Sequence, residues 1–137
     1  ANSDSIEVGL HEFGHSFADL ADEYDYQDST TYTGSEPVEP NVSIHNASQL
    51  QNLQTKWHRW LPEANVDAFE GAYYNQFGVY RPTNNSKMRS LNQPFEQINT
   101  EQIIVSAYKT VRPIDSATPA GTYSSNVVLN VDPVDPI

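Results

Sequence analysis

The residues best suited to chemistry lie in the pentad HEFGH, which contains His11, Glu12 and His15. On an α-helix, residues four apart lie on one face, so both imidazoles can reach a single metal ion. Histidine nitrogens bind zinc at about 2.0–2.1 Å, and a carboxylate beside the first histidine can take a proton from a water on the metal. The pattern predicts a zinc peptidase site with Glu12 as general base. The ordinary alternative is a surface helix with two incidental histidines.

The third metal ligand must come from elsewhere. The chain has no cysteine, so this ligand is a histidine or a carboxylate. A straight helix would carry Asp22 about 10 Å beyond His15, so the helix must end near residues 18–21 and the chain must fold back. In the acidic cluster that follows, Asp22 is the first choice, Glu23 the second and Asp19 the third. The two losing carboxylates are expected to orient the imidazole N–H groups. Two other histidines are alternatives without a spacing argument, His45 and His58.

Hydrophobic spacing and turn residues predict the elements that position these groups. In the first helix the apolar positions recur every three or four residues, and Asp4 or Ser5 can cap its start. Ser48 can cap the second helix. The expected elements are a helix over 5–21, a loop over 27–48, a helix over 48–60, a hairpin within 66–81, a helix over 94–111 ended by Pro113, and a β-rich stretch at 127–131.

Length and composition bound the class of protein. The 137 residues suffice for one modest domain. Of these residues, 37% are hydrophobic and 11% are aromatic. Seven basic residues against 18 acidic ones give a net charge of −11, which argues against binding nucleic acid or anionic membranes. No apolar run is long enough for a membrane span. The acidic, cysteine-free composition is typical of a secreted or cell-surface protein of bacterial origin.

Several blocks of the sequence, in order, resemble the IgA-peptidase-type metallopeptidases, peptidase family M64, which belong with the metzincin-like zincins. The resemblance covers roughly residues 5–110 and is far more specific than the pentad alone. The blocks are HEFGHSFADLADEY, EPNVS, KWHRWL, FEGAYYNQFGVYRP and SKMRSLNQPF.

The resemblance implies a role for each matching residue. His11 and His15 match ligands of one catalytic Zn²⁺, Asp22 matches the third ligand, and Glu12 matches the general base. Met88 matches the methionine of the turn beneath the metal, which gives an apolar floor without coordinating the ion.

The sequence also departs from the metzincin pattern HExxHxxGxxH or HExxHxxGxxD. Ala18 stands where that glycine would be, and Ala21 where the third ligand would be, so Asp22 is displaced by one residue. Many metzincins have a tyrosine two residues after the methionine, whereas this chain has Ser90. Three tyrosines could supply such a hydroxyl, although each is expected first to pack the hairpin: Tyr24, Tyr74 and Tyr80.

The fold implied by the resemblance is α+β and zincin/metzincin-like, represented mainly by the active-site helix and the lower, largely helical subdomain, with a β-rich tail. Residues 1–113 would form the C-terminal part of a catalytic domain. Residues 114–137 would be a linker and the start of a β-sandwich-like module. Zincins place a β-sheet before the active-site helix, so the missing N-terminal part of the same domain is an expected partner. Ala1 in place of an initiator methionine agrees with this expectation.

The predicted function is therefore a zinc-dependent endopeptidase acting on a protein or peptide substrate. The alternative is a non-catalytic fragment or binding module that retains a zinc site. The acidic stretches 19–25 and 36–41 could also bind Ca²⁺ through oxygen ligands, although no EF-hand spacing is present. Arg81 and Arg89 either pair with carboxylates of residues 19–25 and so hold the chain reversal, or are solvated arginines on the surface.

Overall fold

The structure, a computed structural model, describes residues 3–112 and 114–133. Four strands form two separate antiparallel sheets, β1–β2 and β3–β4. This mixture of helices and small sheets agrees with the predicted α+β class. No helix among the described residues is long and apolar enough to cross a membrane. The elements are α1 (Ser3–Ala18), α2 (Ala47–Leu53), the 3-10 helix η1 (His58–Trp60), β1 (Phe69–Ala72), β2 (Asn75–Arg81), α3 (Glu96–Thr110), β3 (Ile114–Ala117) and β4 (Val131–Pro133).

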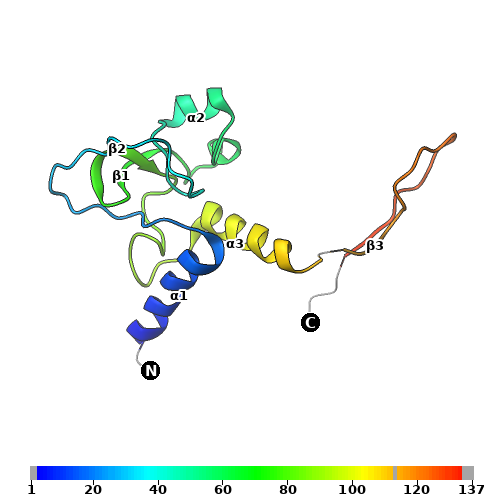
Figure 1. Cartoon of the computed structure of the whole chain (residues 1–137), viewed down its shortest axis with the longest axis horizontal. Helices are drawn as coiled ribbons and strands as arrows, with labels where there is room; N and C mark the ends of the chain where they lie inside the picture. The colour runs from blue at the N-terminus through cyan, green and yellow to red at the C-terminus, as the bar shows by residue number, and fades with distance from the viewer. Residues whose placement is uncertain (1–2, 113, 134–137) are drawn as a thin grey trace.

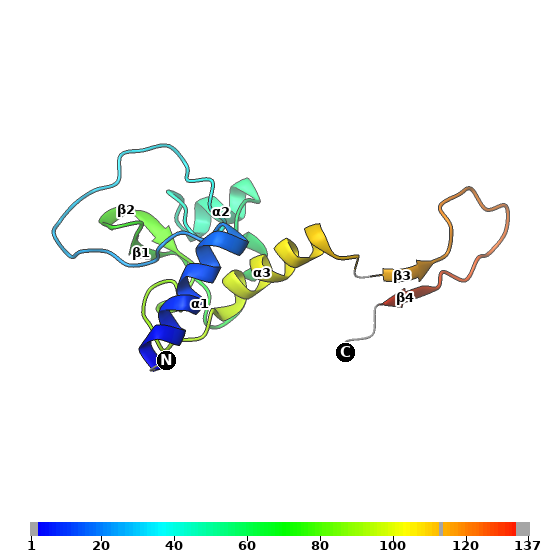
Figure 2. The same cartoon turned by 60° about the horizontal axis from the view of Figure 1, so that its bottom comes forward.

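The helices α1 and α3 pack against each other, and the β1–β2 hairpin lies to one side of them with α2 (Figures 1 and 2). The β3–β4 hairpin projects away from this body in both views. The core of the body is divided into three small clusters. Their buried members are Ala18, Leu20 and Met88; Ala21, Val42, Ala72 and Val79; and Leu50, Trp57, Val66 and Ile98.

The first helix ends in a left-handed (αL) cap that reverses the chain. The N–H of Leu20 donates to the carbonyl of Gly14 at 3.2 Å, and the N–H of Asp19 donates to the carbonyl of His15 at 3.1 Å. Asp19 has the left-handed φ of 52° that this motif requires. Aspartate tolerates that conformation better than most residues, so the chain turns here without the metzincin glycine. The predicted end of the helix near residues 18–21 is confirmed.

The segment from Asp19 to Asn46 contains no helix or paired strand, as predicted for residues 27–48. It runs alongside the β1–β2 hairpin and is joined to it by three isolated β-bridges, Asp25 with Tyr74, Thr31 with Phe77, and Ser43 with Tyr80. The hairpin therefore supports the acidic stretch after α1.

Two predictions of helix boundaries are wrong. Asp4 and Ser5 lie inside α1 and do not precede it. The predicted helix over 48–60 is broken, because a capping box between Asn46 and Gln49 starts α2 earlier and Gln54 ends it in a left-handed conformation. The helix-like apolar spacing continues to Trp57, which precedes the separate turn η1 and is buried by tertiary packing.

The structure of the tail agrees with the prediction from the sequence only in part. Of the predicted β-rich stretch 127–131, Val131 alone is in a strand, and its partner strand β3 was not predicted. Val128 and Leu129 are largely exposed. The division at residues 113 and 114 stays a prediction, and Pro113 and residues 134–137 lie outside the described residues.

Candidate metal centre

The two histidines of the pentad are held by backbone carbonyls. Nδ1 of His11 lies 2.9 Å from the carbonyl oxygen of Lys87, and Nδ1 of His15 lies 2.6 Å from that of Leu20. A carbonyl oxygen can only accept, so each Nδ1 carries the proton. In the neutral imidazoles, each Nε2 then offers a lone pair, as metal-ligating histidines do.

These lone pairs converge with one oxygen of Asp22. Oδ1 of Asp22 is 3.0 Å from Nε2 of His11 and 3.2 Å from Nε2 of His15, and the two Nε2 atoms are 3.0 Å apart. Asp22 is 7% exposed, and its Oδ1 is buried without a hydrogen-bond partner. Three acceptor atoms thus face one point, an arrangement that a cation stabilises.

The spacing of the three atoms matches zinc. Bonds of about 2.0–2.1 Å in a tetrahedral arrangement place neighbouring ligand atoms about 3.3 Å apart. The observed separations of 3.0–3.2 Å are close to this edge. Nitrogen and carboxylate donors are also the set that catalytic zinc uses when it keeps one position open. Among the described residues, no other group of three histidine, aspartate or glutamate side chains converges in this way.

Asp22 is fixed by the β1–β2 hairpin on both its backbone and its side chain. The N–H of Tyr73 donates to the carbonyl of Asp22 at 3.0 Å. The hydroxyl of Tyr74 donates to Oδ2 of Asp22 at 2.5 Å. This hydrogen bond and burial beside the Asp22 charge raise the pKa of Tyr74 well above its usual value, so the hydroxyl keeps its proton at neutral pH. Tyr74 therefore supplies a hydroxyl to the site, whereas the sequence favoured simple packing.

Glu23, the second choice for the third ligand, points the other way. Its fully buried carboxylate accepts hydrogen bonds from Asn41 and Asn99 at 2.9 Å each and from the hydroxyl of Ser86 at 2.7 Å. Burial raises the pKa of Glu23, while these hydrogen bonds lower it. Its N–H also donates to the carbonyl of Met88 at 2.8 Å. Glu23 thus joins the chain reversal to the methionine turn and to α3.

Met88 packs against α1, and its place in a turn beneath a metal stays a prediction. Its side chain is completely buried with Ala18 and Leu20. A β-carbon at Gly14 would lie 2.6 Å from Sδ of Met88 and 3.1 Å from Cε1 of Phe95. The glycine between the two histidines therefore allows the methionine to approach the helix.

Glu12 is exposed on α1 and is free to meet a ligand. It lines a cavity of about 210 Å³ with His11, Val8, Tyr24 and others. His15 lines a separate cavity of about 360 Å³ with Asp19 and Glu39. Asp19, the third choice as ligand, lies at this rim, outside the converging group. Each histidine of the candidate centre thus borders a cavity.

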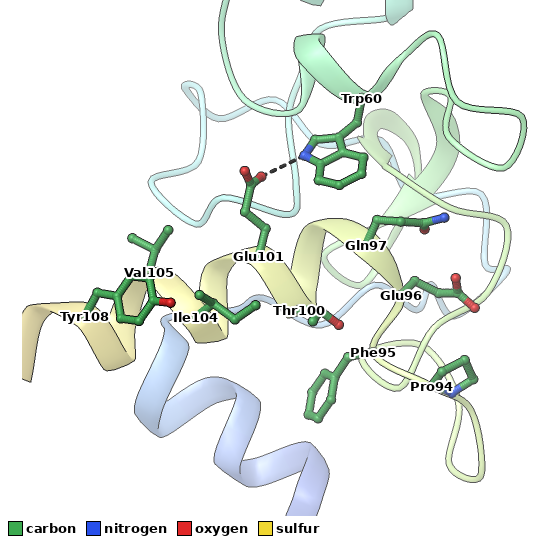
Figure 3. A pocket seen from close by; sticks show the side chains of 10 residues that line it. All are labelled: Trp60, Pro94, Phe95, Glu96, Gln97, Thr100, Glu101, Ile104, Val105 and Tyr108. Carbon is green, nitrogen blue, oxygen red and sulfur yellow. Dashed lines mark hydrogen bonds between the residues drawn. The ribbon is translucent and has the colours of Figure 1, made fainter. Parts of the chain in front are cut away.

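A larger cavity, of about 720 Å³, lies along α3, away from the candidate centre (Figure 3). At one end, Nε1 of Trp60 donates to the carboxylate of Glu101 at 2.7 Å. Its lining is otherwise largely apolar and includes none of the converging residues. Cavity size alone would therefore not select the candidate centre.

The remaining predicted residues have structural roles. Arg89 pairs with Asp25 at 3.1 Å and donates to the carbonyl of Glu23, which confirms its predicted place at the chain reversal. Arg81 instead donates to backbone carbonyls of residues 70, 71 and 84, and burial lowers its pKa to about 10. His45 and His58 are outside the centre, as is Tyr80, whose backbone pairs with Ser43. The calcium site stays a prediction. Asp25, one of the carboxylates in the acidic stretch 19–25, forms an ion pair with Arg89.

Two supporting residues were missed. The ammonium of Lys87 donates to the carboxylate of Glu7, which ties α1 to the segment whose carbonyl holds His11. Glu7 precedes His11 by four residues, so helical spacing could have placed it on the histidine face. The carbonyl partners of the histidines leave no signal in the sequence, because every residue has one.

Comparison with known proteins gives one result. A family model described as IgA Peptidase M64 matches residues 1–66 and 62–106. These ranges cover most of the 137 residues and contain all the residues of the candidate centre. No curated protein matches the chain.

Proposed function

Because the chain belongs to the IgA peptidase M64 family, whose members are peptidases, we propose that it is a zinc-dependent endopeptidase. The observation that carries the zinc assignment is the unpartnered, buried Oδ1 of Asp22 between two Nε2 lone pairs. We propose His11, His15 and Asp22 as the protein ligands. A metzincin-like fold for the complete catalytic domain is part of the same proposal.

The roles of the residues follow from their positions. Zinc bound there would act as a Lewis acid that activates a water and polarises the scissile carbonyl. Glu12 is exposed beside His11, so its carboxylate can take a proton from the attacking water and deliver it to the leaving amine. The carbonyls of Lys87 and Leu20 keep both imidazoles in the ligating tautomer.

The test is a Glu12→Gln variant, with Glu63→Gln as a matched control that removes an exposed carboxylate outside the centre. We expect casein hydrolysis by the natural protein to be abolished by a chelator and restored by zinc. Glu12→Gln should bind zinc normally and lose about 10²- to 10⁴-fold in kcat/KM, the usual contribution of a general base. Hydrolysis by Glu12→Gln at the natural rate would refute the assignment. Zinc binding without any hydrolysis by the natural protein would favour the non-catalytic alternative.

The outer side of α1 supports a further part of the proposal. Four apolar side chains on one stripe of this helix are between 37% and 58% exposed: Ile6, Leu10, Phe13 and Phe17. We propose that this stripe is covered by another part of the same catalytic domain, which carries the sheet expected of a zincin. A longer form containing such a sheet should bind less hydrophobic dye per molecule than residues 1–137. Equal dye binding would contradict this.

A further inference from the structure

The turn of the β1–β2 hairpin has an unusual composition for its conformation. Ala72 pairs with Asn75, so Tyr73 and Tyr74 are the two residues of the turn, and both have a left-handed φ, 49° and 68°. Two-residue turns with positive φ at both positions strongly favour Asn-Gly or a similar pair. Bulky side chains in this region are outliers that persist only where the surroundings impose them.

Three hydrogen bonds of this turn reach the segment that carries Asp22. The N–H of Tyr73 donates to the carbonyl of Asp22, and the N–H of Tyr74 donates to the carbonyl of Tyr24, each at 3.0 Å. Any residue type could form these two backbone hydrogen bonds. The third contact requires a tyrosine, because the hydroxyl of Tyr74 reaches Oδ2 of Asp22.

The geometry points to Tyr74 as a positioning residue that sets the rotation of the Asp22 carboxylate, with the strained Tyr73–Tyr74 turn as its support. With Oδ2 held by the hydroxyl, Oδ1 faces Nε2 of both histidines. The carboxylate then offers the metal one oxygen, which suits a small four-coordinate ion. Larger ions such as Ca²⁺ often take both oxygens of a carboxylate. This inference rests on the proposed function, since it presumes a metal at this centre.

The contacts of Tyr74 support a role beyond packing. Its ring lies against Tyr24 and Tyr26, with centroids 5.4 and 5.8 Å away, and it is 41% exposed. A phenylalanine could make the same ring contacts. The neighbouring Tyr73 packs into the hydrophobic cluster, and its hydroxyl is 3.3 Å from Glu39. The hydroxyl of Tyr74 thus contacts the carboxylate of Asp22, whereas that of Tyr73 contacts the carboxylate of Glu39.

The experiment compares Tyr74→Phe with Tyr73→Phe, each of which removes one hydroxyl from the same turn. Zinc affinity is measured by chelator competition, and the coordination of a substituted Co²⁺ ion by visible absorption. We expect Tyr74→Phe to bind zinc about 10- to 100-fold more weakly, as is typical on losing a partner of a ligand, and to change the Co²⁺ spectrum. Tyr73→Phe should match the natural protein in both measurements.

A double variant, Tyr73→Asn with Tyr74→Gly, tests the turn itself. It relaxes the backbone and keeps both N–H groups, and circular dichroism shows whether the fold is retained. It should lose at least as much zinc affinity as Tyr74→Phe. Natural zinc affinity in the double variant or in Tyr74→Phe would overturn this inference alone. Absence of zinc binding in the natural protein would overturn the proposed function as well.

Discussion

At the scale of residues, the choice between Asp22 and Glu23 shows how neighbouring carboxylates take different roles. The side chain of Asp22 faces the histidines, while that of Glu23 faces Asn41 and Asn99 in the interior. The interior carboxylate is fully engaged by hydrogen bonds, and the other is left with one unpartnered oxygen. Hydrogen-bond satisfaction thus separates a structural carboxylate from the candidate metal ligand.

A first prediction concerns these carboxylates. Asp22→Ala should reduce zinc affinity by more than the roughly 10- to 100-fold typical of a residue that only supports a ligand. Asp19→Asn is the matched control, since it removes the same charge from an exposed residue at the rim of the site and keeps a side chain that tolerates the left-handed φ. It should bind zinc within a few-fold of the natural protein. The two affinities can be measured by chelator competition, and equal losses would contradict the assignment of Asp22.

At the scale of elements, α1 carries both histidines and is anchored along one side only. Gly14 faces Met88 and Phe95, whereas Gly9 has no atom near the position of a β-carbon. Towards its N-terminal end, Glu7 binds Lys87 and accepts from the N–H of Asn92. Anchors at several turns of the helix therefore hold the ligand face against the segment around Met88.

A second prediction compares the two glycines of α1. Gly9→Ala should stabilise the protein by about 0.5–1 kcal/mol, because alanine is the better helix former and meets nothing. Gly14→Ala should destabilise it by roughly 1–2 kcal/mol. Overpacking of a core costs about 1–3 kcal/mol, and the higher helix propensity of alanine offsets part of this cost. Urea unfolding of the metal-free protein measures both. A higher unfolding free energy in Gly14→Ala would contradict this prediction, because it would show that Met88 can move away from the helix at little cost.

A third prediction concerns pH. The hydrogen bonds from Lys87 and from the N–H of Asn92 hold the pKa of Glu7 below its ordinary value of 4.5. The unfolded chain then binds a proton more readily than the folded one, so this contribution to stability is present above about pH 4.5 and is lost as the pH falls through the folded pKa.

The difference in unfolding free energy between the natural protein and Glu7→Gln should therefore shrink below pH 4.5. It is best measured by urea unfolding in the presence of a chelator, so that protonation of the zinc ligands affects no bound metal. A difference that stays constant down to the lowest pH at which the protein folds would contradict the role given to Glu7.

At the scale of the whole molecule, the described chain consists of a body and a projecting hairpin (Figures 1 and 2). The body brings α1, the acidic stretch, the β1–β2 hairpin and the Met88 segment together at the candidate centre. The strands β3 and β4 pair with each other, and their residues are exposed. The candidate centre therefore depends on long-range contacts within the body and on none with the β3–β4 hairpin.

A fourth prediction follows for the tail. Removing residues 113–137 should leave zinc affinity unchanged and alter the unfolding free energy by no more than about 0.5 kcal/mol, as for changes at exposed positions. Chelator competition and urea unfolding measure the two quantities. A clear loss in either would show that the tail belongs to the catalytic unit, against the predicted boundary at residues 113 and 114.

The sequence by itself predicted the chemistry and the helix that carries the two histidines. The pentad fixes the spacing of His11 and His15, because helical geometry depends only on local backbone angles. The blocks around it indicated the family, which the family model confirms. Local hydrophobic patterns also predicted α3 and the β1–β2 hairpin correctly.

The tertiary structure decided which carboxylate completes the site and what holds it there. Asp22 and Glu23 are adjacent, of similar chemistry, and no local rule orients one of them toward the histidines. Their orientation depends on Tyr73 and Tyr74, which lie 50 residues or more further along the chain, and on Asn99, which is 76 residues from Glu23. Such contacts depend on how the chain folds back on itself, which no local pattern of residues records.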